Sequence, residues 1–170
     1  MDADTAIESD ECSAEEAFEH LSELYTALPR MQEIGARLAQ AKCALLAVET
    51  HARLRSLRRE IETLEAQEAA AAAAAELAQS EGRSPEAVKL LNCDRLYYAA
   101  MRGFKVGPAK NEQVALEDAL KAGGFTSPEE AEAAVLPGDE FERLSKELVS
   151  YQADYAETLA LCQRLEAANI

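Results

Sequence analysis

The sequence predicts an all-α protein, an elongated antiparallel helical hairpin or coiled coil with short helices at its junction. Alanine, leucine and glutamate, which lose little side-chain entropy in a helix, are abundant, whereas tryptophan is absent and other aromatic residues are few. Apolar residues recur every three or four positions, which is the period of one helical face. Serine, proline and glycine punctuate this pattern where helices should begin and end. The sequence therefore favours a single helical domain over residues 13–170.

Residues 1–12 are predicted to form an acidic N-terminal tail. The first helix is expected to begin at Ser13, because its hydroxyl can cap the first turn and Glu16, three residues later, completes a capping box. This helix is expected to end at Leu28, because Pro29 follows and the residue before a proline disfavours the α conformation.

A long second helix is predicted over about residues 29–80. Its apolar residues form two runs with spacings of three and four, the pattern of a coiled-coil seam. The first run is Ile34, Leu38, Ala41, Leu45, Val48 and Ala52, and the second is Leu54, Leu57, Ile61, Leu64, Ala71 and Ala75. Because the two runs are out of phase, we expect a change of packing face near Thr50.

Short helices are predicted after this long one. Ser84 and Pro85 mark the start of a helix that is expected to continue to residue 102. Residues 104–110, FKVGPAK, are predicted to be a loop, and a further short helix should cover residues 111–122.

The last third of the chain contains several residues that are typical of helix ends and helix starts. Gly123 and Gly124 should end one helix, Ser127 and Glu130 should cap the next, and a proline-glycine pair should end that one. A final helix is predicted over about residues 139–168, long enough to lie antiparallel to most of the helix over 29–80. Its seam is Phe141, Leu144, Leu148, Tyr151, Tyr155, Thr158, Cys162 and Leu165.

The net charge of −15 is unevenly distributed. Residues 1–28 carry −9, residues 29–83 are neutral, residues 84–110 carry +3 and residues 111–170 carry −9. The acidic segments at both ends of the chain argue against a general nucleic-acid-binding surface, and a local contact with nucleic acid is kept as an alternative. No apolar run approaches the roughly 20 residues that span a bilayer, and no signal peptide is recognisable, so we expect a cytoplasmic protein.

No metal or cofactor site is expected. Cys12, Cys43, Cys93 and Cys162 are too far apart for metal-ligand spacing, and neither His20 nor His51 has a second ligand nearby in the sequence. Phosphate-binding loops, dinucleotide-binding fingerprints, nucleophile elbows and zinc-protease motifs are all absent. The sequence therefore predicts a protein that is not an enzyme.

An arginine cluster near the middle of the long helix is a candidate site. It consists of Arg53, Arg55, Arg58 and Arg59. Arg55 and Arg59 lie one turn apart and could meet phosphates or an acidic partner. The alternative, which we favour, is that the cluster pairs with Glu49, Glu60 and Glu62 and with acids of the last helix.

An aromatic cluster is a candidate partner patch. It consists of Tyr97, Tyr98, Met101, Arg102 and Phe104. Aromatic residues and arginine dominate interface hot spots, but such residues more often form the core where short helices pack, and we favour that interpretation. Adjacent tyrosines on a helix point about 100° apart, so only one of the two should be buried. The junction core itself is expected to include Phe125, Leu136 and Phe141.

Residues 115–166 resemble the coiled-coil arm of SbcC-type, SMC-like nuclease ATPase subunits. The matching residues are Leu120, Gly124, Phe125, Ala131, Ala134, Leu136, Leu144, Leu148 and Tyr151. The resemblance implies a helical hairpin related to such an arm. The ATPase head motifs and the C-x-x-C zinc hook of that family are absent, so the resemblance implies no ATP hydrolysis, nuclease activity or zinc-mediated dimerisation here.

The function expected from the sequence is that of a non-enzymatic structural or interaction protein that contacts protein partners through its helical faces. One alternative is a DNA-repair or chromosome-associated arm fragment that uses the arginine cluster near DNA. Another is an acidic inhibitor that imitates nucleic-acid charge. The sequence leaves open whether the helices pair within one chain or between two, so a homodimer stays an alternative.

Overall fold

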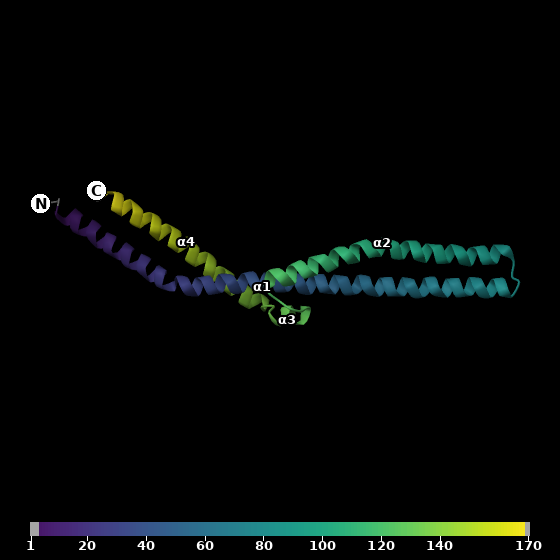
Figure 1. Ribbon diagram of the computed structural model, residues 1–170. Helices are drawn as coiled ribbons and strands as arrows, with labels where there is room; N and C mark the ends of the chain where they lie inside the picture. The colour runs from purple at the N-terminus through teal and green to yellow at the C-terminus, as the bar shows by residue number, and fades with distance from the viewer. Residues whose placement is uncertain (1–3, 169–170) are drawn as a thin grey trace. The chain divides into compact units, whose positions relative to one another are not determined.

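The computed structural model describes residues 4–168, with side chains from residue 14 onwards, and this part of the chain is all-α. Its helices are α1 (Asp4–Ser80), α2 (Pro85–Gly123), α3 (Pro128–Ala133) and α4 (Gly138–Ala168). The chain divides into two compact units. Unit 1 comprises Met1–Ala41 and Leu136–Ile170, and unit 2 comprises Lys42–Val135. Helix α1 contributes to both units, whereas α2 and α3 belong to unit 2 and α4 belongs to unit 1 (Figure 1).

The predicted helix break at Pro29 is wrong, because α1 continues through this residue. A proline inside a helix lacks an N–H donor and crowds the carbonyl of the residue four positions earlier, here Tyr25. The interrupted turn is supported from α4, because Tyr151 Oη donates a hydrogen bond to the neighbouring Leu24 carbonyl over 2.8 Å. Packing within unit 1 therefore offsets the local preference of the proline.

The predicted helix start at Ser13 is also wrong, because α1 begins before this residue. The backbone is helical from Asp4 onwards, and residues 1–3 lie outside the described residues.

The predicted loop over residues 104–110 is wrong as well, since α2 runs without interruption from Pro85 to Gly123 and includes Pro108. Ion pairs to α1 hold the helix on both sides of this proline. Lys105 Nζ lies 2.7 Å from Glu60 Oε2, and Glu112 Oε2 lies 3.1 Å from Arg53 Nε. Instead of two short helices and a loop, unit 2 therefore contains one long helix beside α1 (Figure 1).

The predicted helix signals at Ser84, Gly124 and Ser127 are confirmed, whereas α3 ends at Ala133 and Gly138, which was expected to end it, begins α4. Ser84 caps α2 by accepting a hydrogen bond from the Ala87 N–H, and Gly124 ends that helix in a left-handed conformation with φ of 71°. Ser127 caps α3 by accepting from the Glu130 N–H. The carboxylate of Glu130 in turn accepts from the hydroxyl and the N–H of Thr126, and these hydrogen bonds lower the pKa of Glu130.

The core of unit 1 lies between α1 and α4. Buried Met31, Ile34 and Leu38 of α1 pack with Leu144 of α4. Leu136 and Phe141, which were expected in a junction core, are half-buried against this cluster. All eight residues of the predicted α4 seam are buried or half-buried, so the inward face of this helix was predicted correctly.

The core of unit 2 is formed by α1, α2, α3 and the segment between α2 and α3. Its buried residues are Ala44, Ala47, Leu54, Leu116, Ala119, Phe125 and Ala131. The prediction that Phe125 anchors this region in a core is confirmed, because only 8% of its surface is exposed. The predicted seam position Leu45 is wrong, because Leu45 is 49% exposed and the smaller Ala44 and Ala47 face the core instead.

Candidate functional site

The four arginines of the predicted cluster lie on α1 within unit 2 and divide into two pairs. Arg53 and Arg58 are tied to α2, through Glu112 and through a 2.8 Å hydrogen bond to Gln113 Oε1. The side chains of Arg55 and Arg59 are exposed and have no polar partner among the described residues. The favoured pairing with Glu49, Glu60, Glu62 and the last helix is therefore not the arrangement found.

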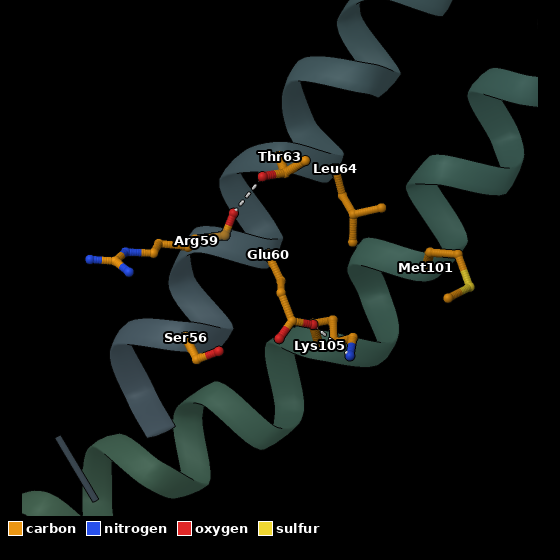
Figure 2. A pocket seen from close by; sticks show the side chains of 7 residues that line it. All are labelled: Ser56, Arg59, Glu60, Thr63, Leu64, Met101 and Lys105. Carbon is orange, nitrogen blue, oxygen red and sulfur yellow. Dashed lines mark hydrogen bonds and ion pairs between the residues drawn. The ribbon is translucent and has the colours of Figure 1, made fainter. Parts of the chain in front are cut away.

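A shallow hollow of about 460 Å³ lies between α1 and α2 beside this cluster. It is lined by Ser56, Arg59, Glu60, Thr63, Leu64, Met101 and Lys105. Figure 2 shows Glu60 and Lys105 reaching toward each other between the helices, while the side chain of Arg59 points away from α2. The hydrogen bond from Lys105, followed by its charge, lowers the pKa of Glu60. The acid and the base in this hollow thus neutralise each other, which suits a contact between helices better than proton transfer.

The predicted aromatic cluster is divided between two faces of α2. Half-buried Arg102 faces α1, where it pairs with Glu65 at 3.4 Å and Glu68 at 3.2 Å. Phe104 is 73% exposed, so the favoured interpretation of this residue as core is wrong, and Tyr97, at 60%, is the exposed member of the tyrosine pair. Tyr98 is half-buried, which confirms that one of the adjacent tyrosines is the more buried.

An exposed stripe on α2, apolar except for Asn111 and called the apolar stripe below, was missed by the sequence analysis. It consists of Leu90, Cys93, Tyr97, Ala100, Phe104, Gly107, Asn111 and Val114, all of which are exposed. The spacing alternates between three and four along the whole stripe, which is the signal that could have found it. The expected loop over 104–110 divided the pattern and concealed it.

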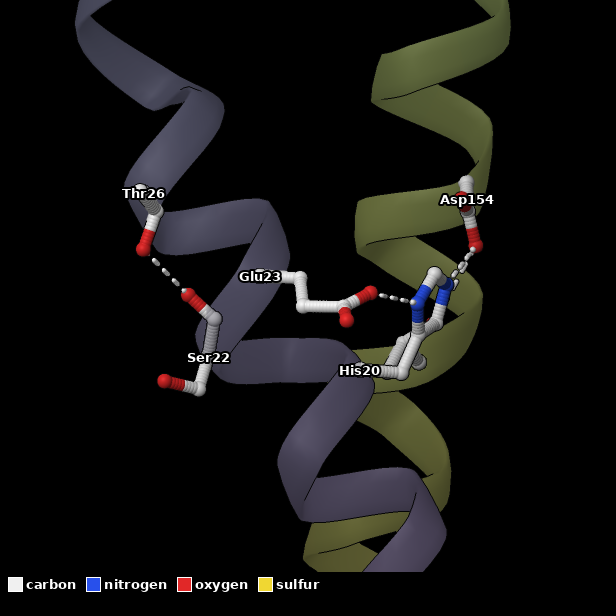
Figure 3. Close-up of polar contacts among 6 residues, drawn as sticks. His20, Ser22, Glu23, Thr26 and Asp154 are labelled. Atoms are coloured by element: carbon white, nitrogen blue, oxygen red, sulfur yellow. Dashed lines mark hydrogen bonds and ion pairs between the residues drawn. The ribbon is translucent and has the colours of Figure 1, made fainter.

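A histidine of unit 1 is held between two carboxylates, as Figure 3 shows. His20 Nε2 lies 2.9 Å from Asp154 Oδ1 on α4, and His20 Nδ1 lies 3.6 Å from Glu23 Oε2 on α1. The hydrogen bond to Asp154 is the main cause that raises the pKa of His20 above its ordinary value of 6.5, and the bond to Glu23 adds to it. Sequence reasoning could not find this contact, because Asp154 is distant along the chain.

We expect unit 1 to lose stability as pH rises through the pKa of His20. The raised pKa means that the folded state binds the proton more tightly than the unfolded state, so this stabilisation is complete below pH 6.5 and disappears above the folded-state pKa. Melting temperature measured from pH 5.5 to 8.5 should fall more in the wild type than in His20→Gln. An NMR titration that placed the pKa of His20 below 6.5 would contradict the expectation.

A tyrosine cluster lies beside a second hollow in unit 1, of about 340 Å³. The rings of Tyr25 and Tyr155 meet edge to face with centroids 5.6 Å apart, and Tyr151 stacks on Tyr155 at 6.1 Å. The hydrogen bond with Tyr25 is the main cause that raises the pKa of Tyr155. This cluster joins α1 to α4, and it contributes packing and orientation at the turn that contains Pro29.

The described helices contain no segment apolar and long enough to cross a membrane. Among residues whose side chains the structure describes, no group of three or more histidine, cysteine, aspartate or glutamate residues is placed to hold a metal ion. Comparison with known proteins found no matching family model, no matching curated protein and no matching solved structure.

Proposed function

We propose that this chain is a non-enzymatic helical interaction protein whose helix pairs form antiparallel coiled-coil hairpins and present their outer faces to protein partners. The observation that carries the proposal is the exposed apolar stripe on α2, because contiguous exposed apolar surface on a soluble helix marks a site of protein contact.

The order of the ion pairs supports antiparallel hairpins. In unit 2, successive α1 residues Arg53, Glu60 and Glu65 pair with Glu112, Lys105 and Arg102, so partners on α2 descend as residues on α1 ascend. In unit 1, His20, Arg30 and Arg37 pair in the same descending way with Asp154, Glu147 and Glu140. Each pair has at least one solvent-exposed side chain and contributes little to stability, but together they favour one register of the helices.

Photo-crosslinking in the native host tests this function. A benzophenone amino acid is introduced in place of Tyr97 or Phe104, and in a control in place of the exposed Gln67 of α1. We expect light-dependent protein adducts from positions 97 and 104 and none from position 67. Absence of protein adducts at both stripe positions would overturn the proposal.

A second candidate function is phosphate contact along a nucleic acid, as a DNA-associated arm would make. It is favoured by the exposed side chains of Arg55 and Arg59, which lie one turn apart and lack polar partners among the described residues. Guanidinium groups that are not engaged by carboxylates are available for charge-assisted hydrogen bonds to phosphate oxygens.

Under this second function, duplex DNA should bind at about 50 mM salt and dissociate as salt rises, because counterions are released on binding. The double variant Arg55→Glu/Arg59→Glu should abolish gel retardation. The double variant Arg143→Glu/Arg164→Glu makes the same change in net charge on α4 and should retain most of the binding. Equal loss in both variants, or no retardation of the wild type, would exclude the Arg55 and Arg59 contact.

A further inference from the structure

The exposed stripe on α2 has the spacing of a complete coiled-coil seam. Its eight positions from Leu90 to Val114 alternate by three and four residues, and they extend about 36 Å at 1.5 Å per residue. The residues of α2 that pack on α1, such as Tyr98, Arg102 and Leu116, are buried or half-buried and lie on the other side of the helix. Helix α2 therefore carries two seams, of which α1 covers one.

We infer that the stripe is the interface of a homodimer, in which α2 packs antiparallel against α2 of a second copy. The inference rests on the proposed function and names the partner. An interface that is symmetric about a two-fold axis must be complementary to itself, and the stripe can be tested for this residue by residue.

Side-chain size is complementary in an antiparallel pair whose two-fold axis passes at the level of Arg102 along α2. Leu90 then faces Val114 of the second copy, and Cys93 faces Asn111. Tyr97 faces Gly107, and Ala100 faces Phe104, so each large aromatic side chain meets a small residue. In a parallel arrangement Phe104 would face Phe104 and Gly107 would face Gly107, which crowds one layer and leaves a void in the next.

Charge is complementary as well. On the edge of the seam, Lys89 of one copy lies beside Glu117 of the other, and the symmetry makes this contact twice. Beyond the last apolar layer, Glu86 would approach Asp118 of the second copy, and this repulsion limits the seam to the apolar stripe.

The apolar area is sufficient for a specific dimer. Leu90, Tyr97, Phe104 and Val114 are 65%, 60%, 73% and 57% exposed. With about 150–250 Å² for a whole aromatic side chain, the stripe offers on the order of 500 Å² per copy. Two copies together reach about 1,000 Å², the lower bound of a specific interface, and the roughly 500 Å² per copy has the size of the largest apolar patch on a monomer, which is often a contact site.

Disulfide trapping tests the arrangement on the full chain. Every variant carries Cys12→Ser, so that Cys93 is the exposed native thiol, since Cys43 is half-buried and Cys162 is buried. With oxidised glutathione as the oxidant, Asn111→Cys should give a covalent dimer through Cys93 and the thiol introduced at position 111 of the second copy. Neither the Cys12→Ser protein alone nor Cys93→Ser/Asn111→Cys should give one, because like positions are distant in the antiparallel dimer.

Sedimentation equilibrium provides a second measurement without new thiols. Phe104→Glu places a carboxylate in the seam and should weaken dimerisation by about 100-fold or more. Leu46→Glu, at an exposed residue of α1 outside the stripe, should leave dimerisation unchanged.

Each contrary outcome has a defined meaning. A covalent dimer formed by the Cys12→Ser protein through Cys93 alone would show a parallel pair and overturn the inference. A monomer at all concentrations, with no covalent dimer from Asn111→Cys, would also overturn it. In that case the proposed function still stands if photo-crosslinking at positions 97 and 104 captures a different protein, and it fails if no protein is captured.

Discussion

Replacement of Phe125 by alanine is expected to lower the free energy of unfolding by about 3–5 kcal/mol. Phe125 is the one aromatic residue among the buried members of the unit 2 core. A Cβ added at Gly123 would lie only 2.2 Å from Phe125 Cε2, so the ring occupies the space that a side chain would take at that position. Truncation would remove this apolar surface and leave a cavity between α1, α2 and α3 that the rigid helices cannot close.

Phe104→Ala is the matched control, because the same atoms are removed from a side chain that is 73% exposed. Its cost should be less than about 1 kcal/mol. Both variants are compared by urea denaturation at a concentration at which the wild type sediments as a monomer, because Phe104 lies in the proposed dimer interface. Similar losses for the two variants would show that Phe125 does not have the core role described above.

Replacement of Leu54 by alanine is expected to cost about 2–5 kcal/mol. Leu54 is 1% exposed and is one of the two largest side chains that are fully buried among the described residues. The preceding buried positions on α1 are the small Ala44, Ala47 and Thr50. These neighbours on the same helix are therefore too small to fill the space.

Leu45→Ala serves as the control for Leu54→Ala, since Leu45 is exposed on the same helix and the substitution has the same effect on helix propensity. We expect a loss of less than about 1 kcal/mol for Leu45→Ala in the same urea titration. A larger loss for Leu45→Ala than for Leu54→Ala would indicate that the predicted seam, rather than the observed one, faces the core.

The sequence was sufficient for the helical class and for those boundaries that depend on local chemistry. Ser84, Gly124 and Ser127 could be assigned because a cap acts within one turn. The helical content itself follows from composition and period, which are also local properties of the chain.

Boundaries that depend on tertiary contacts could not be assigned in this way. Pro29 and Pro108 disfavour helix locally, and only partners on another helix, Tyr151 for one and Glu60 for the other, show why the helix continues. Similarly, the choice between Leu45 and Ala44 for the core depends on how closely the neighbouring segments approach α1, and hydrophobicity alone favours leucine.

The candidate sites were only partly predicted, because they too depend on tertiary contacts. The arginine and aromatic clusters were recognised by residue type, but which members are exposed depends on the face that meets the neighbouring helix. Arg53 is paired and Arg55 is not, and this difference depends on the position of Glu112 on α2, which the sequence alone does not give. The exposed stripe could be recognised in the sequence by its spacing of three and four residues. The incorrect prediction of a loop over residues 104–110 interrupted this spacing and concealed the stripe.

The division of the chain has a consequence for the entropy of folding. Unit 2 is a single uninterrupted stretch of sequence, whereas unit 1 is made of two stretches that precede and follow it. In the sequence, unit 2 is therefore an insertion in unit 1. If unit 1 formed first, it would have to close a loop containing all of Lys42–Val135, and the cost of closure rises with loop length. When unit 2 is folded, Cys43 and Val135 pack against the same core, so the two ends of the insertion are already close together. Folded unit 2 thus lowers the entropic cost of closing unit 1, and because the total free energy does not depend on the order of folding, folded unit 1 favours unit 2 by the same amount.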